Sequence, residues 1–333
     1  MLKLKYLFEN YDLARKCLAF YEHDEASLHD MLSYFRISSN AIYPFRKKGD
    51  THEVCFLRLS PSEEKSFSSV SAEIALLTWL NEKGFPAMKP VAMTTGEFAR
   101  ELDTEWGRYH VSCFEKVPGQ SLEDVQGTVS IVRGYGQILG KLHAWMKVYP
   151  GSQRHRDHKD LLTEIGGRLK EYDAPEAVRE EYGAVCRELE QLFISSSNYG
   201  VIHYDFEPDN VFYDAAENAF SVIDFDDAIR CWYALDIVRA LDALDEVVDG
   251  NRIGDAANLF LEGYQSATDL TDEQKQSFSL MRRLVRLQEY ATLLHVLWDP
   301  IAQQPDWMTE IIRKLQYKVL CLEQSMAADA TES

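Results

Sequence analysis

The sequence has little of what marks disulfide-bonded, zinc-binding or membrane proteins. Its 333 residues contain six cysteines, with neither a Cys-x-x-Cys pair nor a cluster of cysteine and histidine, so a disulfide framework and a zinc site are not expected. No run approaches the roughly 20 apolar residues of a membrane span. Glu9 and Asp12 interrupt the apolar residues where a signal peptide would have its core. We therefore expect a cytoplasmic protein with reduced thiols and no membrane partner.

Basic residues are scarce relative to acidic ones. The chain has 35 Lys and Arg against 54 Asp and Glu, a formal charge of −19, which argues against a nucleic-acid partner. The deficit is uneven, because residues 1–117 carry a net charge of −2 and residues 118–333 a net charge of −17. With 46% hydrophobic residues the chain can build a folded core, and at roughly 150 residues per domain its length suggests about two domains.

The first third of the chain alternates between helical and strand patterns. Residues 7–34 have apolar side chains at helical spacing. Apolar alternation on both sides of Lys47-Lys48-Gly49-Asp50 predicts a hairpin within Tyr34–Ser60. An amphipathic helix is expected over Ser71–Lys83. Two more strands are expected around Val91–Thr94 and Tyr109–Phe114, with a hinge of the chain near Gly119.

The rest of the chain is mainly helical by pattern. The exception is Val201–Asp227, where a buried strand, a loop and another strand are expected. The predicted helices cover Ser130–Met146, Asp160–Tyr172, Ala177–Ile194, Leu235–Val248, Ala256–Ser266, Glu273–Leu297 and Asp306–Ser325. The pattern thus predicts a sheet-containing lobe over residues 1–117, with helices at 7–34, and a larger helical lobe over residues 118–333.

The strand–loop–strand segment carries the most informative residues. It contains His203-Tyr204-Asp205 and, five residues after Asp205, Asn210; an apolar strand then ends in Ile223-Asp224-Phe225-Asp226. Phosphoryl transfer needs a carboxylate that orients the acceptor hydroxyl and oxygen ligands that hold Mg²⁺ against the phosphates. Asp205 suits the first role, and Asn210 and Asp224 suit the second. His203 is expected to pack behind the loop. Any one of these residues alone could simply cap a turn, but their joint spacing favours catalysis.

With these motifs, the sequence resembles the aminoglycoside phosphotransferase and choline kinase-like branch of the protein-kinase-like fold, from about Tyr34 to about Tyr264. The resemblance implies an α+β, bilobal fold, with a small N-terminal lobe of antiparallel sheet plus helix and a larger, mainly helical C-terminal lobe. It implies that Asp205 is the catalytic base, that Asn210 and Asp224 hold Mg²⁺, and that ATP is the donor. Asp236 matches the family's aspartate that anchors the following helix.

The same resemblance assigns nucleotide-binding residues to the first lobe. Arg58 and Glu73 occupy the places of the strand cation and helix glutamate that meet the phosphates; protein kinases have a lysine where Arg58 stands, but an arginine can also grip phosphate oxygens. No glycine-rich loop is present. Ser39 and Asn40 lie where that loop would be and are the candidates to replace it. Backbone groups around Phe114 and Glu115 are expected to read the adenine.

Asp224 is followed within a few residues by another predicted helix, so no activation segment for a peptide substrate is visible. This favours a kinase for the hydroxyl of a small molecule, such as an aminoglycoside, a choline-like amino alcohol or homoserine. The acidic second lobe would attract a cationic acceptor, but an ordinary solubilising surface explains it equally well. Two alternatives stay open: a Ser/Thr protein kinase of the same fold, and a nucleotide-binding regulator without turnover. The pattern gives no oligomeric state.

Candidate acceptor residues lie in several segments. Acidic candidates flank the catalytic residues, and aromatic faces could hold a cation, although Tyr290 and Trp298 also fit an apolar core stripe. Three arginines on the same helix could pair with acidic neighbours or bind an acceptor carboxylate. The candidates are Glu207, Asp209, Asp226, Asp227, Trp232, Tyr290, Trp298, Arg282, Arg283 and Arg286.

Overall fold

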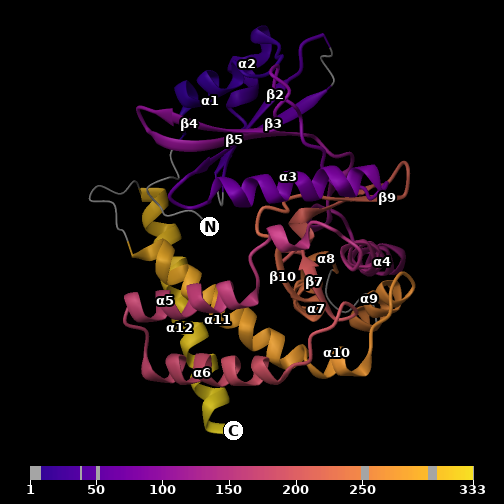
Figure 1. Ribbon diagram of the computed structural model, residues 1–333, viewed down its shortest axis with the longest axis vertical. Helices are drawn as coiled ribbons and strands as arrows, with labels where there is room; N and C mark the ends of the chain where they lie inside the picture. The colour runs from indigo at the N-terminus through magenta and orange to yellow at the C-terminus, as the bar shows by residue number, and fades with distance from the viewer. Residues whose placement is uncertain (1–8, 38–39, 50–52, 249–254, 299–305, 333) are drawn as a thin grey trace.

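The computed structural model describes residues 9–37, 40–49, 53–248, 255–298 and 306–332. A five-stranded antiparallel sheet, in the order β1-β2-β3-β5-β4, forms the upper part of the molecule in Figure 1. Helices α1 and α2 cover one face of this sheet, and α3 lies along the other (Figure 1). These elements are β1 (Arg36–Ile37), β2 (Ala41–Arg46), β3 (Val54–Pro61), β4 (Ala99–Thr104), β5 (Gly107–Glu115), α1 (Tyr11–Leu18), α2 (Leu28–Leu32) and α3 (Phe67–Glu82).

Strand β3 shows how sequence alternation positions the site. Its side chains point alternately to the two faces of the sheet. Cys55, Leu57 and Leu59 are buried in the cluster that packs against α1 and α2. Arg58 therefore points to the opposite face, where α3 presents Glu73. The apolar alternation of β3 thus places the cationic side chain of Arg58 on the face of the sheet that is turned towards the rest of the molecule.

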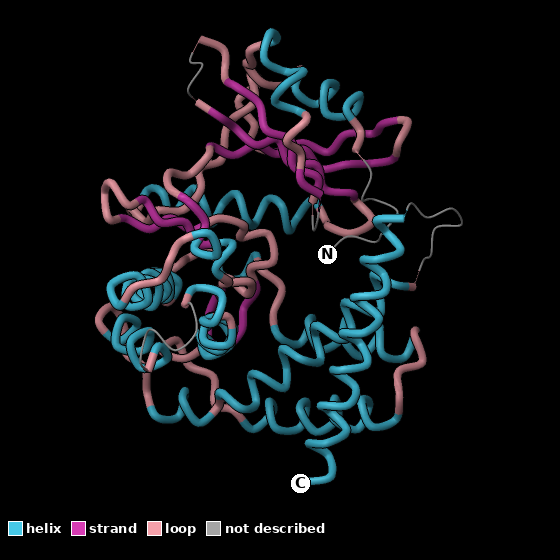
Figure 2. Tube along the Cα trace, turned by 180° about the vertical axis from the view of Figure 1, so that it is seen from behind, coloured by secondary structure: helices cyan, strands magenta, loops and turns pink. Residues whose placement is uncertain are grey.

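The lower part is mainly helical (Figures 1 and 2). Two small sheets lie inside it, β7 paired with β10 and β8 between β6 and β9. Helices α4 and α9 pack side by side, and α5, α6, α11 and α12 form a second group (Figure 1). The elements are β6 (Gln120–Ser121), β7 (Tyr199–Ile202), β8 (Val211–Asp214), β9 (Ala219–Val222), β10 (Ile229–Trp232), α4 (Val129–Met146), α5 (His158–Glu171), α6 (Glu176–Gln191), α7 (Tyr233–Asp242), α8 (Leu244–Val247), α9 (Ala256–Gln265), α10 (Asp272–Gln276), α11 (Phe278–Leu297) and α12 (Asp306–Glu332). None of the described helices is long and apolar enough to cross a membrane.

The glycine expected at a hinge is required by its surroundings. Gly119 lies just after β5 with φ of +88°, a backbone conformation that residues with a Cβ rarely adopt. A Cβ at this position would overlap the carbonyl oxygen of Tyr213 on β8. The chain can therefore pass from the five-stranded sheet to the lower part at this point only with glycine.

Three sequence expectations were wrong in detail. The fourth strand of the sheet is Ala99–Thr104, not Val91–Thr94. Because β4 is an edge strand with alternating half-exposed and exposed residues, it lacks the apolar face that the pattern search requires. The helix expected over Leu235–Val248 is divided at Ala243 into α7 and α8, and the one expected over Glu273–Leu297 is divided at Ser277 into α10 and α11.

Candidate active site

The loop between β7 and β8 holds Asp205 and Asn210. The Asn210 side-chain amide donates to the Asp205 carbonyl oxygen at 2.9 Å and to its Oδ2 at 3.1 Å. Asn210 is buried, whereas 44% of the Asp205 side chain is exposed. Because the amide nitrogen of Asn210 faces Asp205, its Oδ1 is left as the oxygen that could meet a metal ion.

The residue before Asp205 has an unusual backbone conformation. Tyr204 has φ of +77°, which is uncommon outside glycine and costs about 1–3 kcal/mol. The buried carboxylate of Asp236, in the first turn of α7, holds it there by accepting the backbone N–H groups of His203 at 2.8 Å and Tyr204 at 2.7 Å. Asp236 also lies 3.1 Å from Nε2 of His143. The anchoring aspartate therefore fixes the backbone conformation from which Asp205 projects.

Asp224 is brought to the same place by the hairpin β8–β9. The N–H of Ile223 donates to the Asn210 carbonyl at 3.0 Å, and Nε2 of buried His203 lies 2.8 Å from the Ile223 carbonyl. Asp224 follows directly, with φ of +60°. These contacts place the backbone that leads into Asp224 beside Asn210, which is itself bonded to Asp205.

The electrostatics of Asp224 suit a cation. Burial and the neighbouring Asp226 raise the pKa of Asp224 well above its ordinary value. In the described part of the chain its carboxylate accepts no hydrogen bond, and Arg58 is the ion partner at 3.9 Å. A carboxylate in this situation is stabilised in its ionised form by a divalent cation. Asp224 and Asn210 are both oxygen donors of the kind that Mg²⁺ prefers.

Arg58 and Glu73 form a buried ion pair under the sheet. The two guanidinium nitrogens of Arg58 donate to the two carboxylate oxygens of Glu73, one at 2.9 Å and the other in a shorter contact. The Arg58 and Glu73 side chains are 3% and 2% exposed. Nε of Arg58 donates to Ser112 at 3.3 Å, and its guanidinium lies 4.5 Å from the centroid of the Phe114 ring. The strand cation and the helix glutamate predicted from the resemblance thus lie in direct contact.

The other nucleotide candidates have mixed outcomes. Phe114 is buried against Arg58, and the N–H of Glu115 donates to the Lys89 carbonyl at 2.9 Å. That backbone donor is therefore already used within the protein. Ser39 lies outside the described residues. Asn40 is buried, and its side-chain amide donates to Asp226 at 2.6 Å while its oxygen accepts from Ser60 at 2.5 Å. Asn40 thus links the sheet to the segment after β9 that carries Asp224 and Asp226, and both polar ends of its side chain are occupied.

Lys65 is a site residue that the sequence did not indicate. It follows β3, and its Nζ contacts Oδ2 of Asp226 at 2.6 Å and Oδ1 of Asp227 at 2.9 Å. Burial alone would raise the pKa of Asp226, but Lys65 and Arg58 hold it well below its ordinary range. In the sequence, Lys65 follows two glutamates next to a proline and looks like a solvated turn residue. Its tertiary partners are about 160 residues away, so no local pattern could reveal them.

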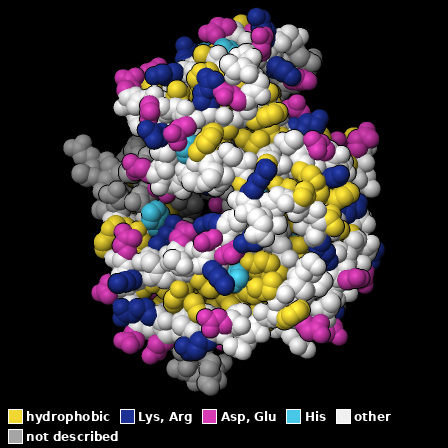
Figure 3. Space-filling model, in the orientation of Figure 1, with side chains coloured by type: hydrophobic (Ala, Val, Ile, Leu, Met, Phe, Trp, Pro, Cys, Tyr) yellow, Lys and Arg dark blue, Asp and Glu magenta, His cyan; other side chains and the backbone are white. Residues whose placement is uncertain are grey.

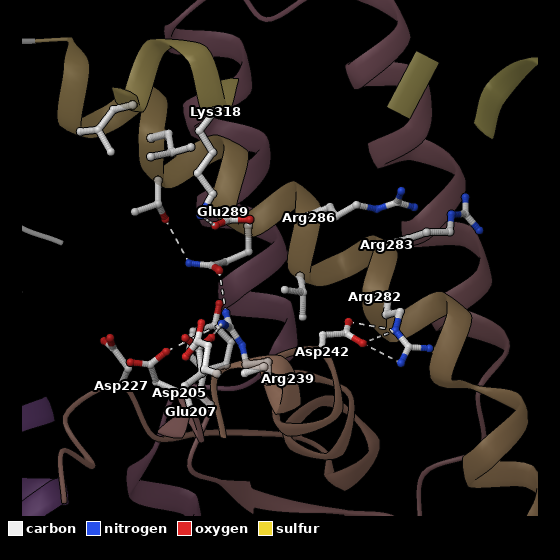
Figure 4. A pocket seen from close by; sticks show the side chains of 18 of the residues that line it. Asp205, Glu207, Asp227, Arg239, Asp242, Arg282, Arg283, Arg286, Glu289 and Lys318 are labelled. Carbon is white, nitrogen blue, oxygen red and sulfur yellow. Dashed lines mark hydrogen bonds and ion pairs between the residues drawn. The ribbon is translucent and has the colours of Figure 1, made fainter. Parts of the chain in front are cut away.

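A large polar cavity opens beside Asp205. It has a volume of about 940 Å³ and lies between the loop that joins β7 to β8, helix α7 and the helices α6, α11 and α12 (Figure 4). Asp205, Glu207 and Asp227 lie together on one side of it, and Glu289 and Lys318 face them from α11 and α12 (Figure 4). In the surface view, the molecule is hollowed between its upper and lower parts, with charged side chains of both signs at the edge (Figure 3).

The cavity contains only part of the expected acceptor set. Among the described residues, its lining includes Glu207, Asp227 and the three candidate arginines of α11. Arg282 pairs with Asp242, and Arg283 pairs with Glu181 and Glu188. Asp226 lines a smaller adjoining cavity of about 310 Å³, and exposed Asp209 lines neither.

The aromatic candidates lie elsewhere. Trp232 is 3% exposed in the main core, and Tyr290, 1% exposed, donates its hydroxyl to Glu323 at 2.6 Å. Trp298 packs on Tyr172 with ring centroids 4.7 Å apart. None of the three lines the cavity beside Asp205. The core alternative therefore holds for Tyr290, whereas Trp298 is 56% exposed, and the lining of this cavity provides no aromatic cage from the three candidates.

The chain is similar in sequence and in fold to known small-molecule kinases. It is 28% identical over 225 residues to the homoserine kinase of Caulobacter vibrioides. The aligned region covers 66% of this chain and 68% of that protein. Its fold matches an amicoumacin kinase solved with AMP-PNP and Ca²⁺, with a TM-score of 0.76, 18% identity and coverage of 97% and 95% of the two chains. It also matches a microcompartment-associated aminopropanol kinase, with a TM-score of 0.67, 18% identity and coverage of 96% and 98%.

The sequence profile of the phosphotransferase enzyme family matches residues 37–270, which include the five-stranded sheet, the catalytic loop and α7. The mixed α+β architecture implied by the resemblance is confirmed by the structural matches. The chain therefore belongs to the phosphotransferase enzyme family and is a kinase with an alcohol acceptor.

Proposed function

We propose that this protein transfers the γ-phosphoryl group of ATP to the hydroxyl of a small molecule bound in the cavity beside Asp205, and that Asp205 is the base. The contacts of Asn210 carry this proposal, because its side chain bonds to Asp205 and its carbonyl accepts from Ile223, the residue before Asp224. In it, the Asp205 carboxylate accepts the proton of the acceptor hydroxyl as the oxygen attacks the γ-phosphorus. Only eight residues lie between Asp224 and the start of α7 at Tyr233, which leaves no platform for a peptide substrate.

Asn210 and Asp224 would hold Mg²⁺ in this proposal, and Arg58 would contact the nucleotide phosphates. These oxygen donors fit Mg²⁺. The amide nitrogen of Asn210 is turned towards Asp205, which leaves its oxygen for the metal ion, and the charge of Asp224 is poorly compensated. Bound Mg²⁺ would neutralise charge on the phosphate oxygens. Residues 1–117 would then form the nucleotide-binding lobe and residues 118–333 the acceptor lobe. Because ATP is the proposed donor and the six cysteines are free thiols, we place the enzyme in the cytoplasm.

We further propose that the acceptor carries a protonated amine. Asp205, Glu207 and Asp227 are partly exposed carboxylates at the cavity floor. An ammonium group with N–H donors can hydrogen-bond to them, whereas a quaternary ammonium has no donor and depends on aromatic faces. The ring of Tyr204 is the aromatic group in the described lining, and Arg239 already covers it at 5.0 Å. Homoserine and aminopropanol, substrates named for two relatives, carry such an amine.

The test is an ATP-consumption screen with Mg²⁺ over amino alcohols, amino acids with a hydroxyl, and aminoglycosides. Ethanolamine against choline is a matched pair, because the two differ only in methylation of the nitrogen. We expect turnover with at least one primary amine, none with choline, and turnover lowered by about 10²- to 10⁴-fold in Asp205→Asn, which retains the side-chain shape. Equal turnover in Asp205→Asn would remove Asp205 as the base, and a preference for choline would overturn the acceptor class.

A further inference from the structure

Arg239 lies between the catalytic loop and the wall of the acceptor cavity. It belongs to α7, and its side chain is 10% exposed. One terminal nitrogen donates to Glu207 at 3.0 Å and lies 3.7 Å from Oδ1 of Asp205. The other donates to the side-chain oxygen of Gln288 on α11 at 2.9 Å. Figure 4 shows this guanidinium next to Asp205 and Glu207 on the cavity floor.

Arg239 also covers the strained residue of the loop. Its guanidinium lies 5.0 Å from the centroid of the Tyr204 ring, and Tyr204 has φ of +77°. Asp236 holds the backbone N–H groups of this loop and stands one helical turn before Arg239 on the same face of α7. Two residues of one helix therefore fix the loop, Asp236 through the backbone and Arg239 through the side chains.

The contacts continue into the cavity wall. Gln288 accepts from Arg239 and donates its own amide to Thr292 at 3.0 Å. Both Gln288 and Thr292 line the cavity. The planar fork of arginine suits this position because it can reach three partners in fixed directions, which a lysine ammonium on a flexible stem cannot do.

We propose that Arg239 is a positioning residue for phosphoryl transfer: it fixes the Asp205 and Glu207 carboxylates relative to the acceptor wall on α11. This rests on the proposed function of Asp205. Arg239 acts through its neighbours and does not touch the reacting atoms. Removing it leaves the nucleotide site around Arg58 unchanged but lets the base move, and a displacement of about 1 Å can cost 10²-fold in rate.

The test compares Arg239→Gln and Arg239→Lys with Arg230→Gln. Arg230 is a matched control because it is also a partly buried arginine that donates to an amide, Gln153 at 2.7 Å, and to a carboxylate, Asp157 at 3.0 Å. We expect Arg239→Gln to lower kcat about 100-fold with the KM for ATP changed by less than about 3-fold. Arg239→Lys should recover only part of this loss. Arg230→Gln should keep kcat within about 3-fold.

A double-mutant cycle separates positioning from general destabilisation. In an Asp205→Asn background, Arg239→Gln should lower kcat further by less than about 3-fold, because its effect passes through Asp205. The proposal would be overturned if the double variant lowers kcat by the product of the two single effects. It would also be overturned if Arg239→Gln alone leaves kcat unchanged. If Arg239→Gln does not fold, Arg239→Lys decides, because it keeps the buried charge.

Hydrogen exchange gives a readout that does not need turnover. Amides of residues 203–210 should exchange at least about 10-fold faster in Arg239→Gln, and those of α3 should not change. Unchanged exchange in the loop would contradict the proposal. If the wild-type protein transfers no phosphate to any acceptor, the proposed function fails, and the exchange result still decides whether Arg239 holds the loop.

Discussion

Substitutions in the Arg58–Glu73 pair should affect stability and nucleotide affinity differently. Both side chains are almost completely buried, so the Arg58→Met change leaves the Glu73 carboxylate without its partner in a low-dielectric environment. Breaking a buried ion pair in this way costs about 3–5 kcal/mol. Replacing both residues, as Arg58→Met with Glu73→Met, removes both charges together. Apolar replacements of this kind are often neutral in stability, so the double variant should recover most of the loss.

The size of the effect is measurable. At about 2.1 cal/mol/K of unfolding entropy per residue, a chain of 333 residues should lose about 4–7 °C in Tm for the single variant. Urea unfolding followed by tryptophan fluorescence gives the free energy directly. Asp224, 3.9 Å from Arg58, also loses a neighbouring cation in both variants, so this part of the loss should remain in the double variant.

Nucleotide affinity should respond differently from stability. A charge-assisted hydrogen bond contributes about 1.5–3 kcal/mol, so both variants should bind ATP about 10- to 100-fold more weakly in titration calorimetry. A double variant that is as unstable as the single one would show that the two residues do not act as an isolated pair. ATP affinity that survives in the double variant would refute a role for Arg58 in binding phosphate.

Three further changes test other parts of the site. Asp224→Ala should abolish the Mg²⁺ dependence of nucleotide affinity in calorimetric titrations with and without EDTA, and an unchanged dependence would contradict its role as a ligand. Lys65→Met leaves the Asp226 and Asp227 carboxylates without their cation, and should lower the free energy of unfolding by about 3 kcal/mol in urea titrations. A loss below about 1 kcal/mol would count against a stabilising role for these ion pairs. Burial lowers the pKa of His143 and of two other histidines, His155 and His158, so stability should be present above pH 6.5 and fall as the pH drops further, because the unfolded chain binds more protons. Urea midpoints of Asp224→Ala between pH 7.5 and pH 6 measure this, because that variant lacks the carboxyl whose raised pKa acts in the opposite direction. A midpoint that rises on acidification would contradict it.

The closeness of the segments that carry Asp205, Asn210 and Asp224 could be predicted from sequence, because these residues are close together in the chain and bordered by apolar strands. Asp205 and Asn210 share one loop, and Asp224 ends the next strand, so strand pairing alone brings them near each other. Arg58 was predicted from the resemblance, and the alternation on β3 explains its position, because it leaves one charged residue on the face opposite three buried apolar ones. Their chemical roles, and the division of the chain at residue 117, stay predictions.

The remaining site residues depend on contacts that no local pattern encodes. Lys65 and Asn40 meet Asp226 across more than 160 residues. Arg239 interrupts an apolar helix in Ile237-Val238-Arg239-Ala240, and this was the one available signal, since a lone charge in a buried stretch usually has a partner. The aromatic acceptor candidates failed because periodicity shows which residues share a helix face but not what that face covers.

In the proposed site, Asn210 and Asp224 hold a divalent cation next to Asp205. The most direct measurement is the anomalous diffraction of Mn²⁺ in crystals grown with Mn²⁺ and a non-hydrolysable ATP analogue. We predict a manganese peak within about 2.2 Å of Oδ1 of Asn210 and of an Asp224 carboxylate oxygen, with the γ-phosphate directed towards Asp205. A manganese peak bound to the phosphates alone, with neither side chain as a ligand, would show that Asn210 and Asp224 do not hold the metal.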